Sequence, residues 1–194
     1  MKGNTRNDAD LEEVLAKVLK CSIWLEERTA ELYFKISNRL DDQYTAHLLK
    51  IIAHQSKSHA EMLRWIMNNT LKNQKNQQAE PSVPCIKMTG EVGETTVEAI
   101  EYVERREKLT LRDLNEIIGK LEFIEKGVGE ETYSRILLPL IKTTLEQTGP
   151  QQATLEIAQK MIQTIIREEE LHENLVKTIK QRTSEYDARA NPSS

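Results

Sequence analysis

Two histidines and several glutamates occur at spacings that would bring them to one face of a helix. In REEELHENL (residues 167–175), Glu169 and His172 are three residues apart, so both could bind the same ion. The apolar residues on this side of the helix are Ile162, Ile165, Ile166, Val176 and Ile179. Because a buried carboxylate is costly unless a cation neutralises it, we interpret the pair as metal ligands rather than as part of a surface cluster.

A second histidine lies in AHQSKSHAEMLRWI (residues 53–66). His59 belongs to the apolar stripe of a predicted helix, and Ser56 lies one turn earlier on the same face. By itself this pattern is typical of a core histidine with a hydrogen-bond partner, and a metal ligand is the alternative. In another amphipathic segment, Glu26 lies at the edge of a buried stripe or within it.

The elements that must position these residues are four long helices, predicted at about 10–40, 43–69, 111–146 and 151–182. Short turns join the first helix to the second and the third to the fourth. The connection at 68–110 is amide-rich and then proline-containing, and Thr95 with Glu98 predicts a short extra helix in it. Gly127, Gly129 and Pro139 should interrupt or kink the third helix. The pattern predicts an all-α fold, an antiparallel four-helix bundle with one long crossover.

This organisation corresponds to one domain at 10–182, with a flexible N-terminus at 1–9 and a flexible tail at 183–194. Few glycines and prolines, 5% aromatic and 30% charged residues also favour helices. A net charge of −4 gives no electrostatic reason to expect nucleic acid or an anionic membrane as a partner. Two isolated cysteines, Cys21 and Cys85, predict no disulfide framework and a reducing compartment. Without a signal segment or membrane span, we expect a cytoplasmic protein.

The chain resembles the ferritin-like superfamily, and the rubrerythrin-like bundle most closely. EEELHE (168–173) looks like the Glu-x-x-His motif of helix four, and SKSH (56–59) looks like the helix-two motif in register, with His59 as its histidine. GEETYSRILLP (129–139) resembles the helix-three segment and implies Glu130 as a ligand. LEERTAELYF (25–34) resembles the helix-one segment, in which Glu26 is the ligand or, alternatively, Glu27.

The departures from this family are as specific as the matches. Ser56 replaces the carboxylate that bridges two metals in the family, and Tyr133 stands where rubrerythrins carry a further glutamate. No Cys-x-x-Cys pair for a rubredoxin domain follows the bundle. The resemblance therefore implies a degraded di-metal site, with ligands Glu26, His59, Glu130, Glu169 and His172. The set suits iron, manganese or zinc, as one ion or an asymmetric pair.

The function implied by the resemblance is metal binding with iron-dependent reduction of peroxide or O₂, in oxidative-stress or iron metabolism. If the protein is an enzyme, it is an oxidoreductase with a non-haem iron or manganese site and an external electron donor. The alternative is an inactive ferritin-like bundle, without a metal, that acts as a structural or protein-interaction module. A hydroxylase is disfavoured by the lost bridge. The superfamily also implies a homodimer, and we expect neither nucleic acid nor membrane as a partner.

Overall fold

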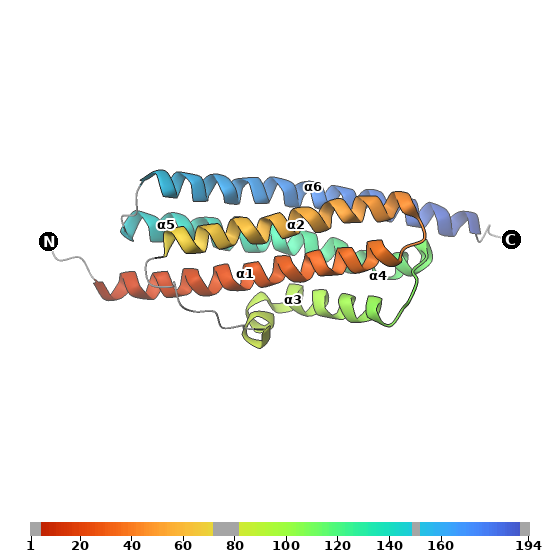
Figure 1. Ribbon diagram of the computed structural model, residues 1–194, viewed down its shortest axis with the longest axis horizontal. Helices are drawn as coiled ribbons and strands as arrows, with labels where there is room; N and C mark the ends of the chain where they lie inside the picture. The colour runs from red at the N-terminus through yellow and green to blue at the C-terminus, as the bar shows by residue number, and fades with distance from the viewer. Residues whose placement is uncertain (1–4, 72–81, 149–151, 191–194) are drawn as a thin grey trace.

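The computed structural model describes residues 5–71, 82–148 and 152–190, which are almost entirely helical (Figure 1). Their bounds are α1 Thr5–Arg39, α2 Gln43–Thr70, α3 Ser82–Glu104, α4 Leu111–Lys126, η1 Gly127–Leu137, α5 Leu138–Thr148 and α6 Gln152–Ala190. Within these ranges there is no β-strand, only an isolated bridge between Leu40 and Leu109. The predicted all-α class is confirmed.

The long helices lie side by side and run in two opposite directions (Figure 1). Helices α1 and α6 run one way, whereas α2 and the segment from α4 through η1 to α5 run the other way. Helix α1 packs against α2 and α3, α4 packs against α6, and α2 also contacts α6. The core between them is continuous and consists mainly of fully buried leucine and isoleucine side chains. This packing brings the inward faces of four helical segments to a common centre.

Sequence signals explain where two of the helices begin. Asp42 caps α2, because its carboxylate accepts the backbone N–H of Thr45 at 2.8 Å. Thr110 and Asp113 form a reciprocal capping box at the start of α4. The prediction that the extra helix begins at Thr95 is wrong, because α3 already starts at Ser82. The kink in α3 occurs at Gly90, whose φ of 55° is a left-handed conformation that glycine adopts without strain.

The third long helical segment is continuous but changes its type. The predicted interruption at Gly127 and Gly129 is an eleven-residue π-helix, η1, in which the backbone is wider than in an α-helix. At its end, the backbone N–H of Leu138 donates to the carbonyl of Tyr133, five residues earlier. Two glycines weaken the α-helix here, and Pro139 lacks the N–H that would continue its hydrogen-bond pattern. The π-helix shifts the register of every residue that follows α4.

Helices extend further at both ends than the periodicity predicts. Helix α1 is already formed at Thr5, whereas residues 1–9 were predicted to be flexible; residues 1–4 lie outside the described part. Helix α6 continues past residue 182 to Ala190, and residues 191–194 again lie outside the description. Thr183 is fully buried and donates to Asn115 on α4 at 2.9 Å. This contact with a distant segment, which local patterning does not reveal, extends the order of α6.

Cys21 on α1 and Cys85 on α3 form a disulfide bond. The expectation of no disulfide is wrong, because α3 packs along α1 and brings Cys85, which is completely buried, to Cys21. The bond therefore ties the crossover to the first helix.

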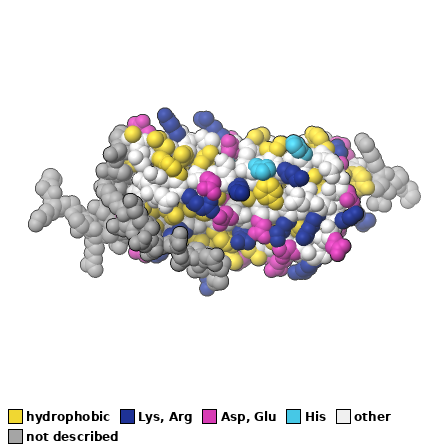
Figure 2. Space-filling model, viewed as in Figure 1, with side chains coloured by type: hydrophobic (Ala, Val, Ile, Leu, Met, Phe, Trp, Pro, Cys, Tyr) yellow, Lys and Arg dark blue, Asp and Glu magenta, His cyan; other side chains and the backbone are white. Residues whose placement is uncertain are grey.

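On the face seen in Figure 2, acidic and basic side chains are interspersed rather than gathered into one patch. Among the described residues, no helix has a stretch that is both long and apolar enough to cross a lipid bilayer.

Candidate metal centre

Five ionisable side chains from four helical segments meet in the interior, and we call them the central cluster. They are Glu26 on α1, His59 on α2, Glu125 on α4, and Glu169 and His172 on α6. They form two groups, one of Glu26, His59 and Glu169 and the other of Glu125, Glu169 and His172, and in each group the ligand atoms lie within 4.8 Å of one another. Glu169 belongs to both groups. All five side chains are buried.

Each histidine of the cluster turns one ring nitrogen toward carboxylates. The Nδ1 of His59 lies 2.9 Å from Glu169 Oε1 and 3.5 Å from Glu26 Oε1. The Nδ1 of His172 lies 3.3 Å from Glu125 Oε2 and 3.5 Å from Glu169 Oε1. The two rings are stacked, with their centroids 5.6 Å apart. Both Nδ1 atoms therefore point into the centre of the cluster.

The opposite nitrogen of each ring is held by a residue outside the cluster. Glu168 Oε2 lies 2.7 Å from the Nε2 of His59, and Gln55 Oε1 lies 3.1 Å from the Nε2 of His172. A carboxylate or amide oxygen in this position accepts an Nε2–H and so favours the tautomer whose Nδ1 carries a lone pair. This is the arrangement that orients a histidine for metal binding through Nδ1.

Two buried tyrosines stand beside two of the carboxylates. The hydroxyl of Tyr133 on η1 donates to Glu26 Oε1 on α1 at 2.5 Å. Burial, followed by the charge of Glu125, raises the pKa of Tyr33 far above its ordinary value. Tyr133 has a similarly raised pKa, caused by burial and then by the charge of Glu26. Both phenols therefore stay protonated over the physiological pH range.

The charges of the cluster are strongly coupled to one another. Burial alone would lower the pKa of both histidines, but the adjacent carboxylates outweigh it and raise the pKa of His59 to about 11 and of His172 to about 10. Burial would raise the pKa of Glu169, but His172 and His59 outweigh it and lower this pKa to about 2. Burial raises the pKa of Glu125 to about 7 and that of Glu26 above its ordinary value. In the metal-free protein, both histidines of the cluster therefore carry an extra proton at neutral pH.

Several buried polar atoms of the cluster have no hydrogen-bond partner. They are Glu26 Oε2, His59 Nδ1, both carboxylate oxygens of Glu125, Glu169 Oε1 and His172 Nδ1. The short distances from Nδ1 to oxygen given above lack the alignment of hydrogen bonds. Buried polar atoms are normally satisfied, so a group of oxygens and nitrogens without partners around one point suits the binding of a cation. Carboxylate and imidazole ligands suit divalent iron, manganese or zinc. These buried Glu/His groups could hold a metal ion.

The structure brings together four of the five residues proposed as ligands: Glu26, His59, Glu169 and His172. It separates the two candidates on helix one, since Glu26 is buried whereas the Glu27 side chain is 47% exposed and pairs with Arg64. It also leaves Glu130 outside the cluster. The Glu130 side chain is 47% exposed and lies 2.7 Å from Arg135.

The carboxylate that the third long helical segment contributes to the cluster is Glu125. The prediction of Glu130 relied on a family motif, whereas Glu130 lies in η1 and points outward. A sequence signal for Glu125 does exist. Glu125 continues the apolar stripe of Leu114, Ile118, Leu121 and Val128 at steps of four and three. In the first hairpin Glu26 precedes Tyr33 by seven residues, and Glu125 precedes Tyr133 by eight. The π-helix between Glu125 and Tyr133 accommodates the extra residue.

Both departures from the rubrerythrin-like pattern, Ser56 and Tyr133, lie in the interior. Ser56 is fully buried and its hydroxyl has no hydrogen-bond partner, so no carboxylate of α2 bridges the two groups. Close packing also occurs where Gly129 on η1 faces Glu169 on α6. A Cβ at this position would lie 2.7 Å from the Cβ of Glu169, so only glycine lets η1 approach α6 this closely.

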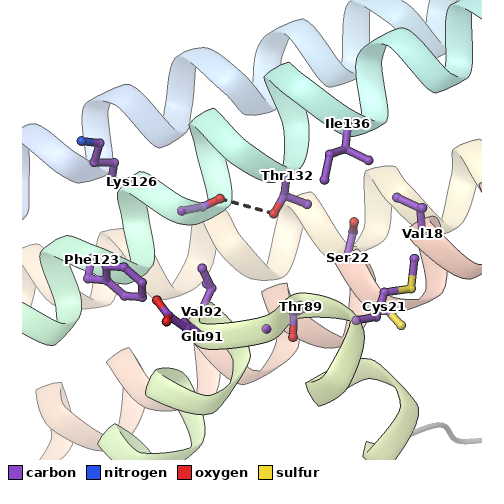
Figure 3. Close-up of a pocket in the computed structure, with 13 residues that line it drawn as sticks. Val18, Cys21, Ser22, Thr89, Glu91, Val92, Phe123, Lys126, Thr132 and Ile136 are labelled. Atoms are coloured by element: carbon purple, nitrogen blue, oxygen red, sulfur yellow. Dashed lines mark hydrogen bonds between the residues drawn. The ribbon is translucent and has the colours of Figure 1, made fainter.

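A cavity of about 570 Å³ lies between α1, the kink of α3 and the junction of α4 with η1 (Figure 3). Its walls include Val18, Cys21, Val92, Phe123 and Ile136, so they are largely apolar. None of the five residues of the central cluster lines this cavity. A smaller cavity, of about 220 Å³, lies between the α4–η1 junction and α6 and is lined by both Glu125 and Glu169.

No protein-family model matches the chain, and it matches no curated protein and no solved structure.

Proposed function

We propose that the chain is a ferritin-like, rubrerythrin-like four-helix bundle that binds one or two divalent metal ions, iron foremost, in the central cluster. The observation that carries the proposal is the convergence of two Nδ1 atoms and three carboxylates, all buried and most without hydrogen-bond partners, on one interior point. The arrangement of the helices supports it, because two antiparallel hairpins joined by a long crossover are typical of ferritin-like proteins.

The ligands would divide between two positions that share Glu169. One position has Glu26 and His59, the other has Glu125 and His172, and Glu168 and Gln55 orient the two imidazoles. A single shared carboxylate screens the repulsion between two divalent ions less well than two would. With Ser56 in place of a second bridge, we expect the second ion to bind more weakly than the first.

The activity that this site supports best is the reduction of O₂ or peroxide. A bound redox-active ion would supply open coordination positions and electrons, which an external donor would replace. The protein's own part is to hold the two imidazoles by their Nε2 atoms, through Glu168 and Gln55.

A structural or protein-interaction module is the second candidate function. It is favoured by the ion-pair distances within the cluster itself, such as 2.9 Å between His59 Nδ1 and Glu169 Oε1. With both histidines protonated, the metal-free interior would be largely neutralised by its own charges.

Metal analysis separates the two functions. Protein purified without chelators and reconstituted anaerobically with Fe²⁺, and separately with Mn²⁺ and Zn²⁺, should retain at least one equivalent of an ion after gel filtration. Retention well below one equivalent for all three would overturn the proposal. His172→Ala adds a second measurement: for a metal protein, its effect on the melting temperature differs with and without the ion, whereas a structural module shows equal effects.

A further inference from the structure

The smaller cavity connects the central cluster to the surface between η1 and α6. At its inner end are the carboxylates of Glu125 and Glu169, and Glu130, Glu170 and Glu173 lie around its outer part. Ser134 on η1 forms part of the wall. The cavity thus has buried candidate ligands at one end and exposed or half-exposed carboxylates at the other.

Carboxylate oxygens at the inner end lack hydrogen-bond partners. Both oxygens of Glu125 and the Oε1 of Glu169 are buried and have no hydrogen-bond partner. These are the atoms that a cation arriving through the cavity would meet. The acidic rim alone would indicate nothing, because exposed glutamates are common on helices, but here it leads to unpartnered carboxylates.

The rim also carries positive charge, so some of its glutamates already have an ion-pair partner. Glu130 pairs with Arg135 at 2.7 Å, and Glu173 pairs with Lys177 at 2.5 Å. Lys126 also lines the cavity. Within the described part of the chain, Glu170 takes part in no ion pair and is exposed. Counting the inner pair, five carboxylates and one lysine line the cavity, so its lining favours cations.

We infer that this cavity is the entry route for the divalent cation, and that Glu170, a rim glutamate without an ion-pair partner among the described residues, draws the hydrated ion toward Glu169 and Glu125. The inference rests on the proposed metal-binding function and assigns Glu130 a place on the route instead of in the ligand set. An ion arriving here would exchange its water for carboxylate oxygens one at a time, first at the rim and then at the inner end.

The experiment is stopped-flow binding of Co²⁺, followed by its visible absorption, to the full-length protein at low ionic strength. Ser134→Phe narrows the route without changing its charge, and Ser184→Phe makes the same substitution on an exposed part of α6. The double variant Glu130→Gln/Glu170→Gln removes rim charge, and Glu156→Gln/Glu185→Gln removes two exposed charges elsewhere on α6. Circular dichroism and the equilibrium stoichiometry show that each variant folds and keeps its ligands.

A route predicts a kinetic signature that damage to the site does not produce. Ser134→Phe should lower the association and dissociation rates by the same factor and leave the Kd unchanged, because it raises a barrier common to both directions. The double rim variant should bind about tenfold more slowly at low ionic strength, and this difference should shrink as salt screens the charges. Both control variants should keep the wild-type rates.

Two results would overturn the inference in distinguishable ways. If wild-type protein binds Co²⁺ while Ser134→Phe and the rim variant bind at the wild-type rate, this cavity is not the route, although the metal site stands. If wild-type protein binds none of Co²⁺, Fe²⁺, Mn²⁺ and Zn²⁺, the proposed function fails and the route fails with it.

Discussion

The hydroxyl of Tyr133 on η1 donates a hydrogen bond to Glu26 on α1, joining a residue of the π-helix to a candidate metal ligand of the first helix. The segments ELYFKI (31–36) and ETYSRI (131–136) are weakly similar and place Tyr33 on α1 in the position of Tyr133. The hydroxyl of Tyr33 is near the charge of Glu125 on α4. Each hairpin thus places a buried phenol beside the carboxylate of the other. The difference is that only Tyr133 has a hydrogen-bond partner.

Replacing Tyr133 by phenylalanine should destabilise the metal-free protein by about 2 kcal/mol, because it leaves a buried carboxylate without its donor. The loss should be smaller in metal-loaded protein, in which the ion neutralises Glu26. Urea denaturation with and without metal measures both values. Tyr33→Phe is the matched control and should cost less, since its hydroxyl has no partner to lose. Equal losses in the two variants would contradict the assigned hydrogen bond.

Neighbouring glutamates give a direct test of which carboxylates bind metal. Glu26→Gln and Glu125→Gln should each weaken metal binding severely, because they remove the charge of a buried ligand. Glu27→Gln and Glu130→Gln change exposed carboxylates and should leave the equilibrium affinity unchanged. Isothermal titration of each variant with Mn²⁺ measures the affinities. Strong weakening by Glu130→Gln would show that η1 adopts another register when metal binds.

Metal uptake should release protons and strengthen as the pH rises. The pKa values of His59 and His172, about 11 and about 10, mean that both imidazoles carry a proton at pH 7 when no metal is bound. Binding through Nδ1 must displace these protons, so the apparent affinity should rise by up to about a hundredfold per pH unit if two protons leave. Titrations in buffers of different ionisation enthalpy count the protons. Affinity that is independent of pH between 6 and 8 would contradict this protonation state.

The stability of the metal-free protein should have the opposite pH dependence. Because the folded-state pKa of each histidine lies above its ordinary value of 6.5, their contribution is complete below that pH and is lost as the pH rises toward 10 and 11. Thermal melting at pH 6, 7, 8 and 9 should therefore show a falling midpoint without metal. His59→Gln is the control and should flatten this dependence.

Ser56→Glu should strengthen binding of the second ion. The buried hydroxyl of Ser56 has no hydrogen-bond partner. A carboxylate introduced there would supply the second bridge between the two ions that rubrerythrin-like proteins have at this position. Metal analysis of the reconstituted variant should approach two equivalents, with the second ion retained better than in the wild type. Ser56→Gln has nearly the same size without the charge and should not show this gain. Stoichiometry that stays at one ion in Ser56→Glu would count against the position of the bridge.

Removing the disulfide between Cys21 and Cys85 should lower the free energy of unfolding by about 4 kcal/mol, the chain-entropy value for a loop of this length. The double variant Cys21→Ser/Cys85→Ser, compared with oxidised wild type in urea, measures the loss. Wild type denatured in the presence of a thiol reductant is the control and should behave like the variant. No difference between oxidised and reduced wild type would mean that the bond does not form in solution.

The pairing of Glu169 with His172 could be predicted from the sequence, because residues three apart share a face in any α-helix. The inward position of His59 followed from the same periodicity. Glu125 was missed even though it lies in an apolar stripe, since the assignment of helix three relied on a motif that points to Glu130. The outer partners of the histidines, Glu168 and Gln55, could not be predicted, because each contacts a histidine on another helix.

The sequence alone indicated where the long helices of the bundle lie and that His59, Glu169 and His172 face inward, since both follow from local hydrogen bonding and hydrophobic periodicity. Tertiary structure decided which of those side chains meet. The register of η1 brings Glu125 rather than Glu130 to the cluster, and the packing of α3 along α1 brings Cys21 to Cys85. These outcomes depend on contacts between residues far apart in the chain, in which the energies of packing, backbone strain and charge burial are balanced together.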